Sequence, residues 1–188
     1  MKRTAFTLLE LILVVAVVAI LSVLVFPDSG AGLYEQLQST AEIVSSDLAY
    51  GRSLAVAAND KYQFTWDTVN NQYILRYSGT NSALTTMPDS PFRLPTDPPT
   101  QHIMALGDLP HIGPPVQLLT VAAGGTTRVT TLEFGPLGGT TSSSPTTVWL
   151  SVGGSSHVLY VTVQVNPVTG LATIGPLSTT GPAQQLLH

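Results

Sequence analysis

A long apolar stretch near the N-terminus restricts this chain more than any other feature. It runs for 21 residues from Phe6 to Phe26, and its only polar members are Thr7, Glu10 and Ser22. As a helix it would be about 30 Å long at 1.5 Å per residue, which matches the hydrocarbon thickness of a bilayer. It is apolar on all sides, so it has no solvent face. The stretch predicts a membrane-spanning helix over residues 6–27.

The basic residues around this stretch predict its orientation. Lys2 and Arg3 precede it, and the next basic residue is Arg52. Because cytoplasmic flanks carry the excess of Lys and Arg, we expect a single-pass topology with a cytoplasmic N-terminus and everything after Phe26 outside.

Glu10 is the unusual residue of the stretch, and three interpretations compete for it. An ionisable residue inside such a segment usually has a function and a partner. A cleaved secretory signal would be shorter and would end in an A-x-A-like site. A plain membrane anchor explains the length but leaves the carboxylate of Glu10 without a role.

The third interpretation comes from a family resemblance. The run Lys2-Arg3-Thr4-Ala5-Phe6-Thr7-Leu8-Leu9-Glu10 resembles the class III signal of type IV prepilins and type II secretion pseudopilins. In that family a short basic leader is cut before a Phe, and a Glu stands five residues into the mature chain. The resemblance implies a leader peptide over 1–5, a prepilin peptidase that cuts between Ala5 and Phe6, and N-methylation of Phe6. Ala5 stands where the family normally has Gly.

The same resemblance implies how the subunit assembles. Glu10 of one subunit would pair with the new amine of Phe6 on a neighbour, because an unpaired buried charge costs several kcal/mol. Thr7 would lie in the same assembly region. The implied partners are other pilins or pseudopilins, through the N-terminal helix, and inner-membrane lipid. The implied location is the inner membrane with a periplasmic head, and a filament after assembly.

Residues 28–60 carry the pattern of a second, amphipathic helix. Its apolar positions recur at steps of three, four and seven, which predicts a helix from about Leu33 to Ala58 that ends near Asn59 and Asp60. The apolar positions are Leu33, Leu37, Ala41, Val44, Leu48 and Ala55. The polar face is expected to hold Glu35, Gln38, Glu42, Ser45 and Asp47. Gly51 inside the helix indicates a bend or a close approach to a sheet.

The remaining residues, 61–188, predict a β-rich head. Period-two segments predict strands at 62–66, 73–77, 116–121, 128–134, 146–152, 158–165 and 171–174. The connections between these strands are too short for crossover helices, so we expect neighbouring strands to pair antiparallel. Residues 78–115 contain many prolines and predict a long irregular loop, and the tail from Gly175 has no pattern. The fold class expected is α+β, in which a long N-terminal helix, membrane-spanning in its first half and amphipathic in its second, packs on an antiparallel head.

Within that family, the chain is most similar to the GspH/FimT-type minor pseudopilins. Three short segments resemble features of that group, namely Gly51 to Ala55 with Asn59, Phe134 to Gly138, and Thr169 to Thr173. Arg52 fits equally well as a surface residue paired with Asp47 or Glu42.

The composition gives little support to catalysis or to nucleic-acid binding. The chain has no Cys, its four His are isolated, and no phosphate-loop or nucleophile-elbow motif is present. Asp89, Asp97 and Asp108 form only a loose acidic group, which is weak for calcium. Seven basic residues are too few for a phosphate-tracking surface, so nucleic acid is disfavoured as a partner. No cofactor, metal or enzymatic activity is expected.

Two functions from different classes remain. The first is a structural pilin or pseudopilin subunit that assembles through its N-terminal helix. The alternative is a secreted or membrane-anchored β-sandwich that binds a ligand on its 78–115 loop.

Overall fold

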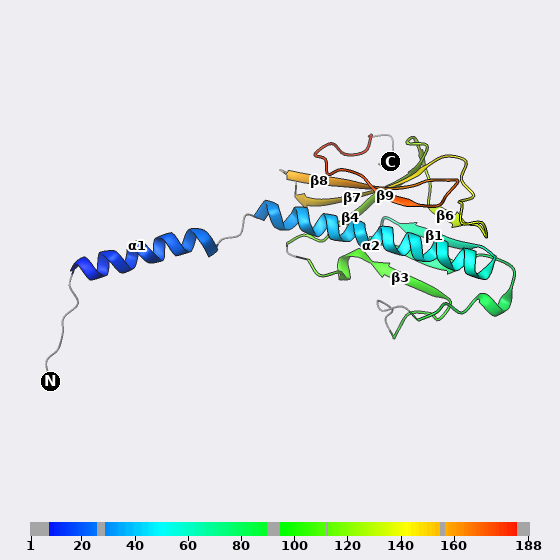
Figure 1. The fold of residues 1–188 in the computed structure, drawn as a ribbon, viewed down its shortest axis with the longest axis horizontal. Coiled ribbons are helices and arrows are strands. Elements are labelled where there is room, and N and C mark those ends of the chain that lie inside the picture. The colour runs from blue at the N-terminus through cyan, green and yellow to red at the C-terminus, as the bar shows by residue number, and fades with distance from the viewer. Residues whose placement is uncertain (1–7, 26–28, 90–94, 112, 155–156, 184–188) are drawn as a thin grey trace. The chain divides into compact units, whose positions relative to one another are not determined.

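A computed structural model describes residues 8–25, 29–89, 95–111, 113–154 and 157–183 of the chain. The chain divides into two compact units, Met1–Gly32 and Leu33–His188. Two long helices are present in the described residues, α1 (Leu8–Val25) and α2 (Ser29–Ala58), and the strands follow them (Figure 1). The architecture is a helix packed on antiparallel sheets, so the expected α+β class is confirmed.

The described part of the segment expected over 6–27 is helical, since α1 has 18 residues from Leu8 to Val25. Residues 6, 7, 26 and 27 of that segment lie outside the described residues. Within the residues that the structure describes, no helix combines the length and the hydropathy needed to cross a membrane.

The second helix ends as its sequence predicts. Asn59 has a φ of 49°, the left-handed conformation that commonly closes a helix. The amide of Asn59 donates to the carbonyl of Val56 at 3.2 Å, and the amide of Asp60 donates to that of Ala55 at 3.1 Å. This pair of hydrogen bonds is a Schellman motif, and it satisfies carbonyls that the helix end would leave unpaired.

The head contains two antiparallel sheets. The first has the strand order β3-β2-β1-β6, and the second has the order β5-β4-β7-β8-β9. The first sheet consists of β1 (Tyr62–Asp67), β2 (Gln72–Tyr77), β3 (Gln101–Ala105) and β6 (Thr131–Phe134). The second consists of β4 (Gln117–Ala123), β5 (Thr127–Arg128), β7 (Thr146–Gly154), β8 (His157–Val165) and β9 (Ala172–Ile174). Short 3-10 helices lie at Ser82–Leu84 and Leu106–Asp108.

Three expectations about the head are corrected by these strands. The single strand expected at 128–134 is two strands in different sheets, because the chain crosses between the sheets after β5. The irregular loop over 78–115 contains β3, which pairs with β2 along the edge of the first sheet. The tail beyond Gly175 continues beside β8, where Ser178 and Tyr160 exchange two backbone hydrogen bonds.

One hydrophobic core joins α2 to both sheets. The helix contributes a fully buried stripe that follows the helical repeat, formed by Leu37, Ala41, Val44, Leu48 and Ala55. Gly51 lies in this stripe, and a Cβ added there would stand only 2.5 Å from Cε2 of Phe64 and 3.2 Å from Cδ1 of Leu75. Gly51 therefore marks a close approach between α2 and the first sheet.

We expect Gly51→Ala to destabilise the head by on the order of 1 to 3 kcal/mol, the usual cost of overpacking. Phe64 is fully buried between other aromatic rings, so it cannot move aside freely. The clash should outweigh the gain of about 1 kcal/mol in helix propensity. Gly32→Ala in the same helix is the matched control, because nothing lies within 4 Å of its added Cβ. Urea unfolding of both variants measures the difference, and an equally stable Gly51→Ala would contradict the close contact.

Candidate assembly surfaces

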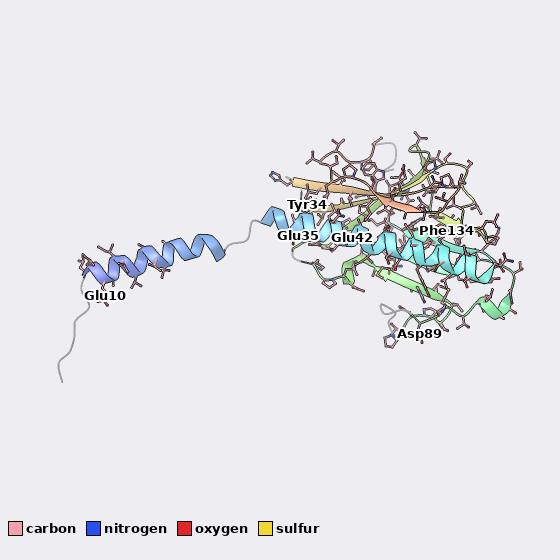
Figure 2. The ribbon with its side chains drawn as sticks, viewed as in Figure 1. Glu10, Tyr34, Glu35, Glu42, Asp89 and Phe134 are labelled. Carbon is pink, nitrogen blue, oxygen red and sulfur yellow. The ribbon has the colours of Figure 1, made fainter. Side chains whose placement is uncertain are left out.

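The residues expected to govern processing lie outside the described part of the chain. Ala5, Phe6 and Thr7 all fall there, so the processing and methylation site and the place of Thr7 in assembly stay predictions. Glu10 is described, and it lies in the first turn of α1 (Figure 2). Its carboxylate is the only charged group among the residues of α1.

The side chains of α1 are uncovered. Every residue from Leu8 to Ala19 is exposed, and the large aliphatic ones keep between 46 % and 78 % of their surface in contact with solvent. Soluble monomers rarely expose contiguous apolar patches larger than a few hundred Å². An exposed apolar surface of this kind is typical of an interaction site for a protein or a membrane.

Arg52 joins α2 to two turns of the head. Its Nε donates to the carbonyl oxygen of Gly138 at 3.2 Å and to that of Thr169 at 2.8 Å. The first turn follows β6 and the second connects β8 to β9. One guanidinium therefore links the helix to a turn from each sheet.

Both turns depend on glycines at this junction. Gly138 has a φ of 82° and Gly170 a φ of 64°, values that L side chains rarely adopt. A Cβ at Gly170 would lie 1.9 Å from the carbonyl oxygen of Gly138. The two turns thus touch through their backbones at Gly170, whereas a Cβ at Gly138 would lie 3.1 Å from Nε of Arg52 and 3.2 Å from Cγ2 of Val56.

The structure brings together the three segments that the family resemblance singled out. Gly51 to Ala55 supplies Arg52, Phe134 to Gly138 supplies one carbonyl acceptor, and Thr169 to Thr173 supplies the other. The ion pair of Arg52 with Asp47 or Glu42, the open alternative, is not the contact that forms. Sequence reasoning missed the carbonyl acceptors because backbone groups leave no pattern in side-chain types.

We expect Arg52→Lys to destabilise the head nearly as much as Arg52→Ala, by about 1.5 to 3 kcal/mol, the range for hydrogen bonds from a charged donor. Lysine keeps the charge but has no donor at the Nε position. Arg76→Lys is the control, because Arg76 is exposed on β2 and its Nη2 donates to Gln63. Equal urea midpoints for wild type and Arg52→Lys would contradict the role given to Nε.

The expected place of Asp47 on the polar, solvent-facing side of α2 is wrong. Asp47 is half-buried and accepts a hydrogen bond of 2.6 Å from the hydroxyl of Tyr73. Burial raises the pKa of Asp47, while the Tyr73 hydrogen bond and His102 oppose that rise. Burial, together with the Asp47 charge, raises the pKa of Tyr73 well above its ordinary value. The hydroxyl of Tyr73 is therefore the proton donor of this pair.

The raised pKa of Asp47 implies a pH-dependent contribution to stability. The folded state binds its proton more tightly than the unfolded state, so the contribution is largest below the ordinary pKa of about 3.9. It is lost as the pH rises through the raised value.

We expect Asp47→Asn to be more stable than wild type at pH 7, because it removes a half-buried charge and keeps an acceptor for Tyr73. The advantage should shrink as the pH is lowered toward 4. Urea unfolding across this pH range measures it, with Glu42→Gln, an exposed acid on the same helix, as the control. A constant difference between Asp47→Asn and wild type at all pH values would contradict this account.

Two hollows of the head are lined by described residues outside 78–115. One, of about 370 Å³, lies beside the β1–β2 turn, and another, of about 300 Å³, lies along β6. Among the residues described, no three His, Asp or Glu side chains gather to hold a metal ion, and this covers Asp89, Asp97 and Asp108. His102 is stacked on Tyr50 and lies 2.6 Å from the carbonyl of Pro88, which is a packing role.

Comparison with known proteins finds a likeness in fold only. No protein-family model matches the chain, and no curated protein matches it. Two crystal structures of the type IV minor pilin FimU from Pseudomonas aeruginosa strain PAO1 are similar to it, at 16 % and 15 % identity and a TM-score of 0.44. The match with the first covers 79 % of this chain and 98 % of the FimU chain, and the match with the second covers 80 % of this chain and 95 % of the FimU chain.

Proposed function

We propose that this chain is a structural subunit of a type IV pilus or a type II secretion pseudopilus, and that it assembles through α1. The observation that carries the proposal is the exposure of every side chain from Leu8 to Ala19 on a helix that includes a single carboxylate. Such a helix is suited to packing against equivalent helices of other subunits. The role is structural rather than catalytic.

The energetics favour a covered α1 in the assembled state. Burying apolar surface contributes roughly 25 cal/mol per Å². The nine large aliphatic side chains that stand exposed on α1 are Leu8, Leu9, Leu11, Ile12, Leu13, Val14, Val15, Val17 and Val18. Covering one such side chain, by lipid or by a neighbouring helix, is worth about 1.5 to 3 kcal/mol relative to water, so a subunit that leaves the inner membrane is stabilised when other helices cover α1.

Glu10 gives the packing its register. A carboxylate inside an apolar bundle is costly unless a cation meets it, and the amine created at Phe6 by cleavage after Ala5 is such a cation. Pairing is satisfied at one axial offset between neighbouring helices and lost at others. Thr7, within one turn of Glu10, would lie at the same contact.

The sequence signal also supports the processing and location that we propose. A prepilin peptidase would remove residues 1–5 at the inner membrane, and the new amine of Phe6 would be methylated. Lys2 and Arg3 favour a cytoplasmic N-terminus, with the head in the periplasm until the subunit joins a filament.

Mass spectrometry of the N-terminus tests the processing directly. We expect the protein recovered from its native cells to begin at a methylated Phe6. A chain that still begins at Met1, or that begins after Phe26, would overturn the proposal. The second result would favour a classical secretory signal.

Substitution of Glu10 tests the assembly role. We expect Glu10→Gln to leave the abundance of the protein unchanged but to prevent its recovery in sheared filaments, because the uncharged amide cannot neutralise the amine. Glu10→Asp keeps the charge and should retain part of the incorporation. Normal incorporation of Glu10→Gln would show that the carboxylate has no such role.

A further inference from the structure

The larger hollow of the head lies where the chain crosses from the second sheet to the first. Its volume is about 370 Å³, and small-molecule sites usually measure roughly 300 to 1,000 Å³. Residues 65–69 and Ile74 of the first sheet and its β1–β2 turn form one part of its wall. Val121 of β4 and the crossing segment 128–130 form the other. We call this hollow the crossover cavity.

Two neighbouring residues of the cavity wall carry buried polar atoms that lack a partner. Trp66 is only 4 % exposed, and its indole Nε1 forms no hydrogen bond with any residue that the structure describes. The hydroxyl oxygen of Thr65 is also buried, and it too has no partner among those residues. A buried polar group without a hydrogen bond is destabilising, so each one needs an explanation. Because an indole N–H can only donate, the missing partner of Trp66 is an acceptor.

Arg128 brings a positive charge to the same wall. Its Nη2 donates to the hydroxyl of Thr68 at 3.1 Å, which joins β5 to the β1–β2 turn. Across the described stretches of the chain, no carboxylate lies within ion-pair distance of this guanidinium. Asp67 is the acidic residue of the wall, and its oxygens accept hydrogen bonds from residues 69–72 within the hairpin. The guanidinium has five N–H donors, so Arg128 keeps several of them for an anion.

Aliphatic side chains supply the apolar part of the wall. Ile74, Val121 and Val129 come from β2, from β4 and from the crossing segment. A molecule that fills the cavity therefore needs an apolar body to match them. It also needs a negatively charged group that accepts hydrogen bonds, to match Arg128 and Trp66.

We propose that the crossover cavity binds a small organic carboxylate with an apolar body. The carboxylate accepts hydrogen bonds from Arg128, from Nε1 of Trp66 and from the hydroxyl of Thr65, and the body lies against the aliphatic part of the wall. Hydrogen bonds between a guanidinium and a carboxylate are roughly twice as strong as neutral ones, which favours a carboxylate over an amide of the same shape. The site uses no residue of α1, so it does not rest on the proposed function.

NMR of the indole groups tests the site, with benzoate as the probe. The chain has two Trp residues, so the ¹H–¹⁵N spectrum of the full-length protein in non-ionic detergent contains two indole signals, which Trp149→Phe assigns. We expect benzoate to move the Trp66 indole proton downfield in a saturable way and to leave the Trp149 signal in place. Benzamide has the same shape without the charge, and it should bind several-fold more weakly. No shift with benzoate, or equal affinities for the two probes, would overturn the proposal.

Substitution of Arg128 tests the charge in the cavity wall. We expect Arg128→Gln to weaken benzoate binding about tenfold, because the amide lacks the positive charge. Arg76→Gln is the matched control, since Arg76 is exposed on β2, does not line the cavity and donates to Gln63. It should leave the benzoate titration unchanged. Equal titrations of Arg128→Gln and wild type would contradict the role given to Arg128.

Substitution of Thr65 separates a binding role from a structural one. Thr65→Val keeps the shape of the side chain and removes the unpaired hydroxyl. We expect it to weaken benzoate binding several-fold but to raise the urea midpoint of the ligand-free protein, because a buried polar group without a partner is lost. A lower midpoint with unchanged benzoate binding would show that the hydroxyl serves the fold, which contradicts the proposal.

Discussion

The contact between α2 and the first sheet at Gly51 sets the geometry of the head. Because the helix backbone lies against the ring of Phe64, the next residue, Arg52, is held at the height of the two turns that it joins. A bulkier residue at Gly51 would lift the helix, and the guanidinium would lose its carbonyl acceptors. The link from α2 to both turns therefore depends on one missing Cβ.

The two helices differ in how much of their apolar surface the structure buries. α2 buries one stripe in the core of its own head and leaves Tyr34, Glu35 and Glu42 in solvent. The described side chains of α1 from Leu8 to Ala19 are exposed and apolar apart from Glu10. In the proposed assembly, equivalent helices of neighbouring subunits cover this surface.

Local pattern predicted much of the head. The helical repeat placed the buried stripe of α2, Asn59 marked its end, and alternation over 62–66 and 73–77 gave the β1–β2 hairpin. The segment 128–134 was wrong as a single strand, because alternation does not show which sheet a residue joins. Asp47 was wrong as a solvent-facing residue, since its position at the edge of the stripe becomes half-buried only when Tyr73 of β2 packs beside it.

The sequence alone determined that the chain has an apolar helix with one carboxylate, an amphipathic helix and an antiparallel head, because hydropathy and periodicity are local properties. The tertiary structure decided that Arg52 binds the backbone carbonyls of Gly138 and Thr169. Those contacts join residues more than eighty positions apart, and their acceptors are peptide groups common to every residue. Only the folded arrangement of the turns could bring them to one guanidinium.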